Sequence, residues 1–300
     1  PHLTHHHLAR YGPLIGRPYL LTVHDLIRYF DLRGFGVFIN PPNLRDRICL
    51  RLDYRGFVTA TAIISVSRTT KWDLTRHLGI PPDRIFVVHE GLDHDLFRPV
   101  ERRLVDSPYV LFVGSEHPRK NLATLLRAFA ALKRERRFRS LRLVKVGAAG
   151  SSEAPFRAPT RELVHELGLE RDVVFTEEVP DEDLPAYYSG AACLVLPSRY
   201  EGFGFPPLEA MACGCPVVIS SAGALAEVAG EAALRVAADD VDGFRAAMRA
   251  VVTEPSLSSG LRERGFNRAR EFSWERAARD TALVYEIVSA RCVSERGVGP

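Results

Sequence analysis

The sequence lacks the long apolar run of a membrane helix and contains little cysteine. No apolar stretch reaches the roughly 18 residues that a membrane span needs, and no charged-then-apolar leader directs the chain to secretion. The five cysteines are an odd, scattered set, without further Cys or His at the spacing of a metal or redox site. Buried, reduced cysteines therefore favour a cytoplasmic protein.

A strong net charge is also absent, since the formal charge is +3, and no nucleic-acid partner is expected. The charge is uneven: residues 1–100 carry +4 and residues 101–300 carry −1. Arg45, Arg47, Arg51 and Arg55 recur among apolar residues. They form either a solvated basic helix face or a patch for an anionic acceptor or an acidic membrane surface, which would place the protein peripherally at the inner membrane face.

The chain alternates between strand and helix patterns, which predicts parallel sheets flanked by helices. Three hundred residues, 46% hydrophobic and 26% charged, suit about two globular domains. In the first hundred residues the predicted strands are 19–23, 62–66 and 85–88, and the predicted helices are 43–58 and 68–78. Later strands are predicted at 110–113, 141–146, 173–175, 192–196, 217–220 and 233–236, with helices between and after them.

One segment carries the most chemical information. Residues 197–218 read PSRYEGFGFPPLEAMACGCPVV, an apolar strand end, a glycine loop and a helix opened by two prolines. Gly202 and Gly204 let the backbone approach a ligand, and Pro207 suits the first helical position. Glu201 lies in the loop and Glu209 on the first helical turn. The free amides and the positive end of such a helix favour a diphosphate.

The two glutamates stand eight positions apart, and the segment resembles the Glu-x7-Glu signature of retaining family 4 glycosyltransferases of the GT-B fold. The resemblance implies that Glu209 accepts hydrogen bonds from the nucleoside ribose. It also implies that Glu201 contacts the sugar hydroxyls and phosphate, together with the amides of Gly202, Phe203, Gly204 and Phe205.

A second segment, Val113–Leu122 (VGSEHPRKNL), resembles the first strand, loop and helix of the family's donor domain, where a basic residue reaches the diphosphate. A cation suits this position because the departing nucleoside diphosphate gains negative charge. The resemblance implies Lys120 for this role, with Arg119 second. Many relatives have an arginine directly after the glycine, where this chain has Ser115, so fewer cations would hold the diphosphate.

The segment Thr22–Leu26 (TVHDL) is similar to the histidine segment of the family's N-terminal domain. This similarity implies that His24 faces the donor sugar across the cleft, where a neutral imidazole both donates and accepts hydrogen bonds. The run His5–His7 could suggest a metal site. Residues adjacent in sequence do not share a face, however, so a solvated loop is expected there.

Further matches extend the resemblance over nearly the whole chain. Residues 179–184 (VPDEDL) resemble the loop near the nucleobase, which places Val179 beside the donor, and residues 272–275 (FSWE) resemble the start of the family's closing helix. Two Asp-x-Asp matches, Asp93–Asp95 and Asp240–Asp242, have the spacing that binds a divalent metal in other glycosyltransferases. We interpret them as a turn and a helix cap, and expect no metal.

The resemblance implies an α/β protein of the GT-B type, with two Rossmann-like doubly wound sheets facing a cleft. The expected parts are an acceptor domain over 1–105, a donor domain over 106–272 and a closing helix over 273–300 that crosses back to the first domain. The first domain is expected to be incomplete, lacking a strand before Pro1.

The expected activity is retaining, metal-independent transfer of a hexose from a GDP- or UDP-sugar to a glycan or lipid-linked acceptor, as in mannosyltransferases of polysaccharide biosynthesis. His24, Glu201 and Lys120 are the expected catalytic residues. No cofactor is expected, because the sugar nucleotide is a substrate. The alternative is a catalytically impaired sugar-nucleotide-binding fragment.

Overall fold

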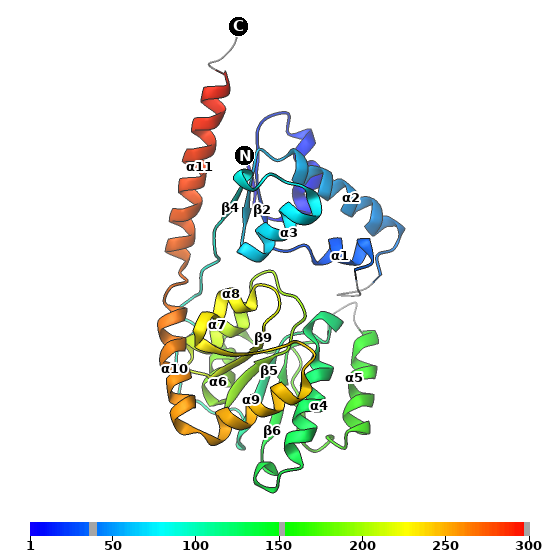
Figure 1. The fold of residues 1–300 in the computed structure, drawn as a ribbon, viewed down its shortest axis with the longest axis vertical. Helices are drawn as coiled ribbons and strands as arrows, with labels where there is room; N and C mark the ends of the chain where they lie inside the picture. Colours follow the sequence, from blue (N-terminus) through cyan, green and yellow to red (C-terminus); the bar gives the residue numbers. More distant parts are fainter. Residues whose placement is uncertain (36–40, 150–153, 297–300) are drawn as a thin grey trace. The chain divides into compact units, whose positions relative to one another are not determined.

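The computed structural model describes residues 1–35, 41–149 and 154–296 of the chain (Figure 1). It contains two compact units: residues 1–91 together with the chain from Phe272 onward, and residues 92–271. Each unit is a parallel sheet with flanking helices, which confirms the predicted α/β fold class. Residues 92–105 belong to the second unit, whereas the sequence placed the boundary after residue 105.

The sheet of the first unit has four parallel strands in chain order, β1 (His2–Leu3), β2 (Leu20–Val23), β3 (Ala62–Ser65) and β4 (Ile85–Val87). The connections are η1 (His6–Leu14), α1 (Ile27–Arg33), α2 (Leu44–Thr59), α3 (Arg68–Leu78) and η2 (Pro82–Arg84). Every strand is added on the same side of the previous one. Right-handed connections therefore place these helices on one face of the sheet.

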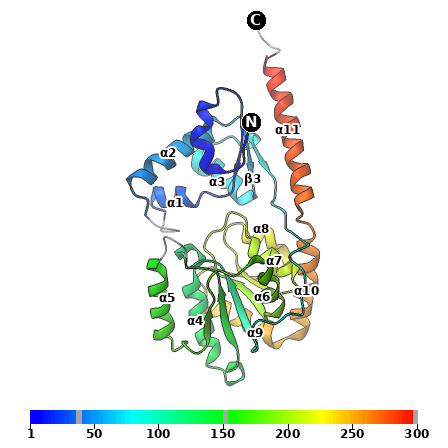
Figure 2. The ribbon, with the colours of Figure 1, turned by 180° about the vertical axis from the view of Figure 1, so that it is seen from behind.

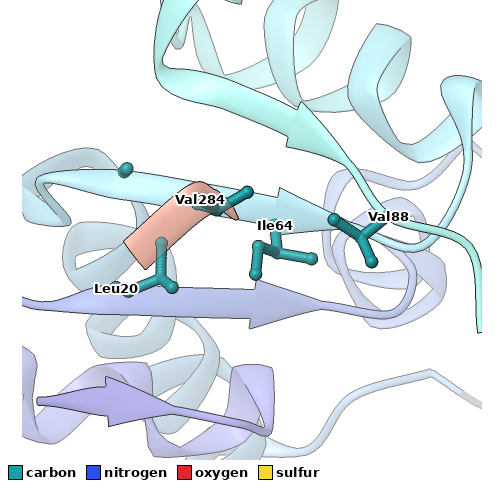
Figure 3. Close-up of a cluster of buried hydrophobic side chains, with 5 residues drawn as sticks. Leu20, Ile64, Val88 and Val284 are labelled. Carbon is teal, nitrogen blue, oxygen red and sulfur yellow. The ribbon is translucent and has the colours of Figure 1, made fainter. Parts of the chain in front are cut away.

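The last helix, α11 (Trp274–Arg296), covers the other face of this sheet. Alternation along the strands points Leu20 and Ile64 to that face. In Figure 3 their side chains form one cluster with Val88 and with Val284 of α11, and all four residues are buried. The first unit therefore has a core on both faces of its sheet.

The sheet of the second unit has six parallel strands in the order β10-β9-β8-β5-β6-β7. The strands are β5 (Tyr109–Val113), β6 (Arg142–Val146), β7 (Val173–Phe175), β8 (Cys193–Leu196), β9 (Val217–Ser220) and β10 (Ala233–Val236). The chain builds outward from β5 in one direction and then from β8 in the other. The loops after the neighbouring strands β5 and β8 therefore leave the same carboxyl edge of the sheet at the point where the strand order reverses, which is where such folds bind ligands.

The second unit contains the helices α4 (Leu122–Lys133), α5 (Ala154–Glu166), α6 (Leu184–Gly190), α7 (Phe205–Ala212), α8 (Leu225–Ala229), α9 (Val241–Thr253) and α10 (Pro255–Ala269). They flank the sheet of this unit (Figure 2). α4 packs against α5 and α9, and α7 packs against α6 and α8. Right-handed crossovers place α4 and α7 on opposite faces of the sheet.

The periodic sequence patterns located every strand that they predicted, within one residue at most ends. They missed β1, η1 and α1, which are short and carry no clear repeat. Within the described part of the chain, no helix is both long enough and apolar enough to cross a lipid bilayer.

We predict that Val284→Ala loosens the first unit, because Val284 is buried between α11 and the sheet. Removing its two methyl groups should cost about 2 kcal/mol. Hydrogen exchange at the amides of β2 and β3 measures this loss. The control is Leu283→Ala, at a side chain that is 55% exposed, which should change protection by less than about 0.5 kcal/mol.

Candidate functional site

The centre of the candidate site is a buried carboxylate held by two cations. Glu201, in the loop after β8, accepts from Arg119 Nη1 at 2.6 Å and lies 2.7 Å from Lys120 Nζ, both of which follow β5. The Ser198 hydroxyl donates to the same carboxylate at 2.8 Å. The predicted residues Glu201, Lys120 and Arg119 therefore meet at the carboxyl ends of the neighbouring strands β5 and β8.

Charge pairing decides the protonation states of this cluster. Burial alone would raise the pKa of Glu201, but the charges of Lys120 and Arg119 outweigh it and lower the pKa below its ordinary value. Burial lowers the pKa of Lys120, and the charge of Glu201 opposes that shift. Glu201 is thus a carboxylate at neutral pH, and its charge opposes the loss of the Lys120 proton that burial favours.

Asn121 connects this cluster to the neighbouring loops. It is a non-glycine residue in the left-handed region, with φ of 55°. Its side-chain amide donates to the carbonyls of Pro197 at 3.1 Å and Ala238 at 2.7 Å. These bonds join the loop after β5 to the loops after β8 and β10. The strained turn therefore fixes Lys120, the residue before it.

The loop that follows Glu201 requires glycine at position 204. Gly204 has φ of +116°, and a Cβ there would lie 2.8 Å from the side chain of Leu225. Gly204 precedes α7, and the rings of Phe203 and Phe205 on either side lie 5.3 Å apart. Gly202, Phe203 and Gly204 are all buried.

The helix start differs from the expected one. α7 begins at Phe205, so Pro207 occupies the third helical position and Glu209 lies on the second turn. The prediction of Pro207 at the first position and Glu209 on the first turn was therefore wrong. Gly204 allows the earlier start, because its left-handed backbone turns the chain directly into the helix.

Glu209 has a different environment from Glu201. It accepts a 2.5 Å hydrogen bond from the hydroxyl of Tyr188, a buried residue of α6. Burial raises the pKa of Glu209 to about 7, and the Tyr188 bond and the charge of Lys120 only partly oppose this. The negative charge of Asp181, two residues after Val179, adds to the increase. Val179 itself is half-buried.

His24 lies in the first unit, directly after β2, and is held by two oxygen atoms. Its Nδ1 lies 2.9 Å from the Glu90 carboxylate and its Nε2 lies 3.1 Å from the Thr4 carbonyl. The hydrogen bond to Glu90 is the main cause that raises the pKa of His24. Because both partners accept, the arrangement suits an imidazolium rather than the neutral ring that was expected.

The His5–His7 run does not form the expected solvated loop. His6 and His7 belong to η1, and His6 is buried, with burial lowering its pKa to about 2. The ring centroids of His6 and His7 lie 4.3 Å apart, and those of His5 and His24 lie 5.6 Å apart. The prediction assumed that residues adjacent in sequence lie on separate faces, but the tight η1 turn brings neighbouring rings together. Among the described residues, no group of these side chains has a metal-binding arrangement.

Both Asp-x-Asp motifs have a local structural role. Asp93 Oδ1 accepts from the backbone amides of Asp95 and Leu96, at 3.0 and 3.1 Å. Asp240 caps α9 and accepts from the amide of Gly243 at 2.8 Å. The first aspartate of each motif therefore stabilises a turn or helix end, as the sequence suggested.

A second ion cluster beside the site was not predicted from the sequence. Lys145, fully buried in β6, lies 3.3 Å from Glu116, and Arg157 of α5 donates to Glu116 at 2.6 Å. Arg157 also donates to Glu177 at 2.7 Å. This cluster ties the loops after β5 and β7 to β6 and α5. A lysine between two valines of a predicted strand was the available signal, because a buried lysine needs a partner.

Family models match both parts of the chain. The model described as "Glycosyl transferases group 1" matches residues 93–269, and "Glycosyltransferase Family 4" matches residues 1–96. The chain is 34% identical over 287 residues to O-antigen chain mannosyltransferase B of Escherichia coli, covering 93% of this chain and 74% of that protein. It is 36% identical over 234 residues to MMP α-(1→4)-mannosyltransferase of Mycolicibacterium hassiacum, covering 76% of this chain and 54% of that protein.

Solved structures share the fold. Sucrose-phosphate synthase from Thermosynechococcus elongatus matches with a TM-score of 0.80 and 26% identity, over 97% of this chain and 73% of that one. Anabaena HepE, solved in complex with UDP-glucose, matches with a TM-score of 0.77 and 18% identity, over 94% of this chain and 75% of that one. The second likeness is one of fold alone.

We predict that Glu209 makes the protein less stable as the pH rises. Its pKa of about 7 in the folded chain exceeds its ordinary value of 4.5, so the folded state holds the proton more tightly than the unfolded state. The free energy of unfolding should therefore fall between about pH 4.5 and 7, by on the order of 3 kcal/mol. Glu209→Gln should remove this part of the decline.

Urea unfolding of both proteins at pH 5 and pH 8 measures the effect. All other groups titrate in both, so the difference between the two pH dependences isolates Glu209. Equal declines in the two proteins would contradict the raised pKa.

Proposed function

Since the chain belongs to the glycosyl transferases group 1 family, we propose that it moves a hexose from a nucleoside-diphosphate sugar to an acceptor hydroxyl. The observation that carries this proposal is the Arg119–Glu201–Lys120 cluster at the carboxyl ends of β5 and β8, with α7 beginning four residues beyond Glu201. The names of two similar proteins, both mannosyltransferases, favour mannose as the sugar. A glycan or a lipid-linked precursor is the proposed acceptor.

The proposed donor site is positive where the leaving group gains charge. Glu201 positions Arg119 and Lys120 at the carboxyl edge of the sheet, and the amide of Phe205 at the start of α7 adds a further donor, since Pro206 and Pro207 have no N–H. A departing diphosphate gains negative charge as the glycosidic bond breaks, so these groups stabilise the transition state more than the ground state. Glu209 and Val179 are proposed to contact the nucleoside.

The proposed reaction is retaining and needs no enzyme nucleophile. In the front-face course, the leaving phosphate oxygen helps to remove the proton of the acceptor hydroxyl. Glu201 is a poor nucleophile because two cations and a hydroxyl already engage its carboxylate. To contact the sugar, the His24 imidazolium would exchange its hydrogen bond to Glu90 or to the Thr4 carbonyl for one to a sugar hydroxyl. His24 therefore stays a proposed catalytic residue, in a different protonation state.

The experiment that tests this proposal is donor turnover with GDP-mannose and a panel of other GDP- and UDP-sugars. Release of free nucleoside diphosphate should depend on an added glycan or lipid-linked acceptor, and the product should keep the anomeric configuration of the donor. Binding of the donor without transfer to any acceptor would instead indicate a sugar-nucleotide-binding protein.

We predict that Glu209→Ala weakens nucleotide binding while the fold survives. A hydrogen bond to a charged group contributes roughly 1.5–3 kcal/mol, so affinity should fall about 10- to 150-fold. Calorimetry with UDP and GDP measures it. Glu263→Ala, at an exposed glutamate of α10, is the matched control and should bind as the unaltered chain does. Unchanged affinity of Glu209→Ala for both nucleotides would remove Glu209 from the site.

We predict that transfer survives chelation by EDTA. Lys120, Arg119 and the start of α7 would supply the positive charge that a divalent ion supplies elsewhere. The measurement is the initial rate before and after EDTA treatment. Loss of transfer that Mg²⁺ or Mn²⁺ restores would show that the reaction requires a metal.

A further inference from the structure

Glu90 forms a hydrogen bond that spans the carboxyl edge of the first sheet. His24 follows β2 and Glu90 follows β4, and β3 lies between these two strands. Neighbouring strands are about 4.8 Å apart, so the ends of β2 and β4 are separated by roughly 10 Å. The Glu90 carboxylate nevertheless reaches His24 Nδ1 at 2.9 Å. This contact depends on a long acidic side chain, because an aspartate at the same backbone position is one methylene shorter.

The backbone beside Glu90 is fixed by a close approach. Gly91 lies against the start of α11, where a Cβ would be 2.3 Å from the amide nitrogen of Trp274 and 2.5 Å from the carbonyl carbon of Ser273. Only glycine fits such a contact with another backbone. Glu90 therefore has little freedom to move away from His24.

The backbone of His24 is held from both sides. Its amide donates to Nδ1 of the buried His6, and its carbonyl accepts from the Thr70 hydroxyl, both at 3.3 Å. The two bonds of the His24 ring differ in environment. The bond of Nδ1 to Glu90 is partly buried, whereas the bond of Nε2 to the Thr4 carbonyl is exposed. A ligand can therefore replace Thr4 at Nε2 while Glu90 stays on Nδ1.

Glu90 and Asp25, together with the rings of His5 and His6, are the titratable groups beside His24 in the described part of the first unit. The hydrogen bond to Glu90 is the largest cause of the raised pKa of His24, and the charge of Asp25 adds to it. The ring centroids of His5 and His6 lie 5.6 and 5.9 Å from that of His24. Burial lowers the pKa of both rings, that of His6 to about 2, so both are neutral at pH 7. Glu90 thus favours the positive charge on His24 rather than on these two neighbouring rings.

We propose that Glu90 is a positioning residue that keeps the His24 ring as an imidazolium with its Nε2–H available to a hydroxyl of the donor sugar. This inference rests on the proposed function of the chain. No proton is transferred: Nε2–H exchanges the Thr4 carbonyl for a sugar hydroxyl oxygen, and Nδ1–H stays on Glu90. A charged donor forms a stronger hydrogen bond than a neutral ring does. A ring that is oriented before the ligand binds also needs no reorganisation during the reaction.

The chain contains a second His–Glu pair that serves as a matched control. His165 Nδ1 lies 2.6 Å from the Glu170 carboxylate in the second unit, and these side chains are 81% and 50% exposed. The corresponding side chains of His24 and Glu90 are 32% and 16% exposed. An exposed pair between residues five positions apart contributes little to stability or position. Glu170→Gln therefore removes the same chemistry at a place where no function is proposed.

Titration of His24 and of sugar transfer in the same proteins tests the proposal. NMR follows the ring protons of His24, which His24→Gln assigns. In Glu90→Gln the ring should lose its proton at a lower pH than in the unaltered chain, because the amide keeps the length of the side chain but not its charge. The kcat/KM for transfer should be about tenfold lower at pH 8. The loss should be smaller at pH 5.5, where both proteins hold the proton on His24.

Glu170→Gln should change neither titration. Glu90→Asp, whose shorter side chain breaks the 2.9 Å contact, should change both in the same direction as Glu90→Gln and replaces it where Glu90→Gln does not fold. An unchanged His24 titration in Glu90→Gln would overturn the proposal. A lowered His24 titration with an unshifted pH profile of transfer would also overturn it, because the pair would then be purely structural. An unaltered chain that transfers sugar to no acceptor would instead contradict the proposed function, and the NMR titration would still decide whether Glu90 holds the proton on His24.

Discussion

The buried charge of Glu201 is the constraint on which the rest of the second unit depends. A carboxylate out of water is stable only when cations and hydrogen bonds surround it, and removing one partner of such a pair costs about 3–5 kcal/mol. Arg119, Lys120 and Ser198 supply those partners. The loops after β5 and β8 must therefore lie together, and Asn121 adds the bonds that hold them there.

Two glutamates of one short motif acquire opposite properties from their surroundings. Cations surround Glu201 and lower its pKa, whereas Glu209 has a tyrosine hydroxyl as its nearest partner and its pKa rises to about 7. Opposite shifts of this kind separate the roles of two carboxylates. Glu201 suits a permanent charge that organises cations, and Glu209 suits a hydrogen-bonding group whose charge a ligand can alter.

The two units use their charged residues differently. In the second unit, Lys120 and Lys145 are buried and each faces a buried glutamate at the carboxyl edge of the sheet. In the first unit, the arginines of α2 point outward beside apolar residues. Buried charges hold side chains in position and interact with a bound ligand at a small site, whereas exposed charges interact with large charged surfaces.

The sequence by itself determined the alternation of strands and helices, and the loop that carries Glu201, because hydrophobic period and glycine placement are local signals. It also indicated Lys120 and Glu209 through the resemblance to a family. Only the tertiary structure decided the state of each group. The Tyr188 bond to Glu209, the two acceptors around His24 and the Lys145–Glu116 pair join residues that lie 20 to 66 positions apart. Their pKa values depend on burial and charge in three dimensions, which no local pattern encodes.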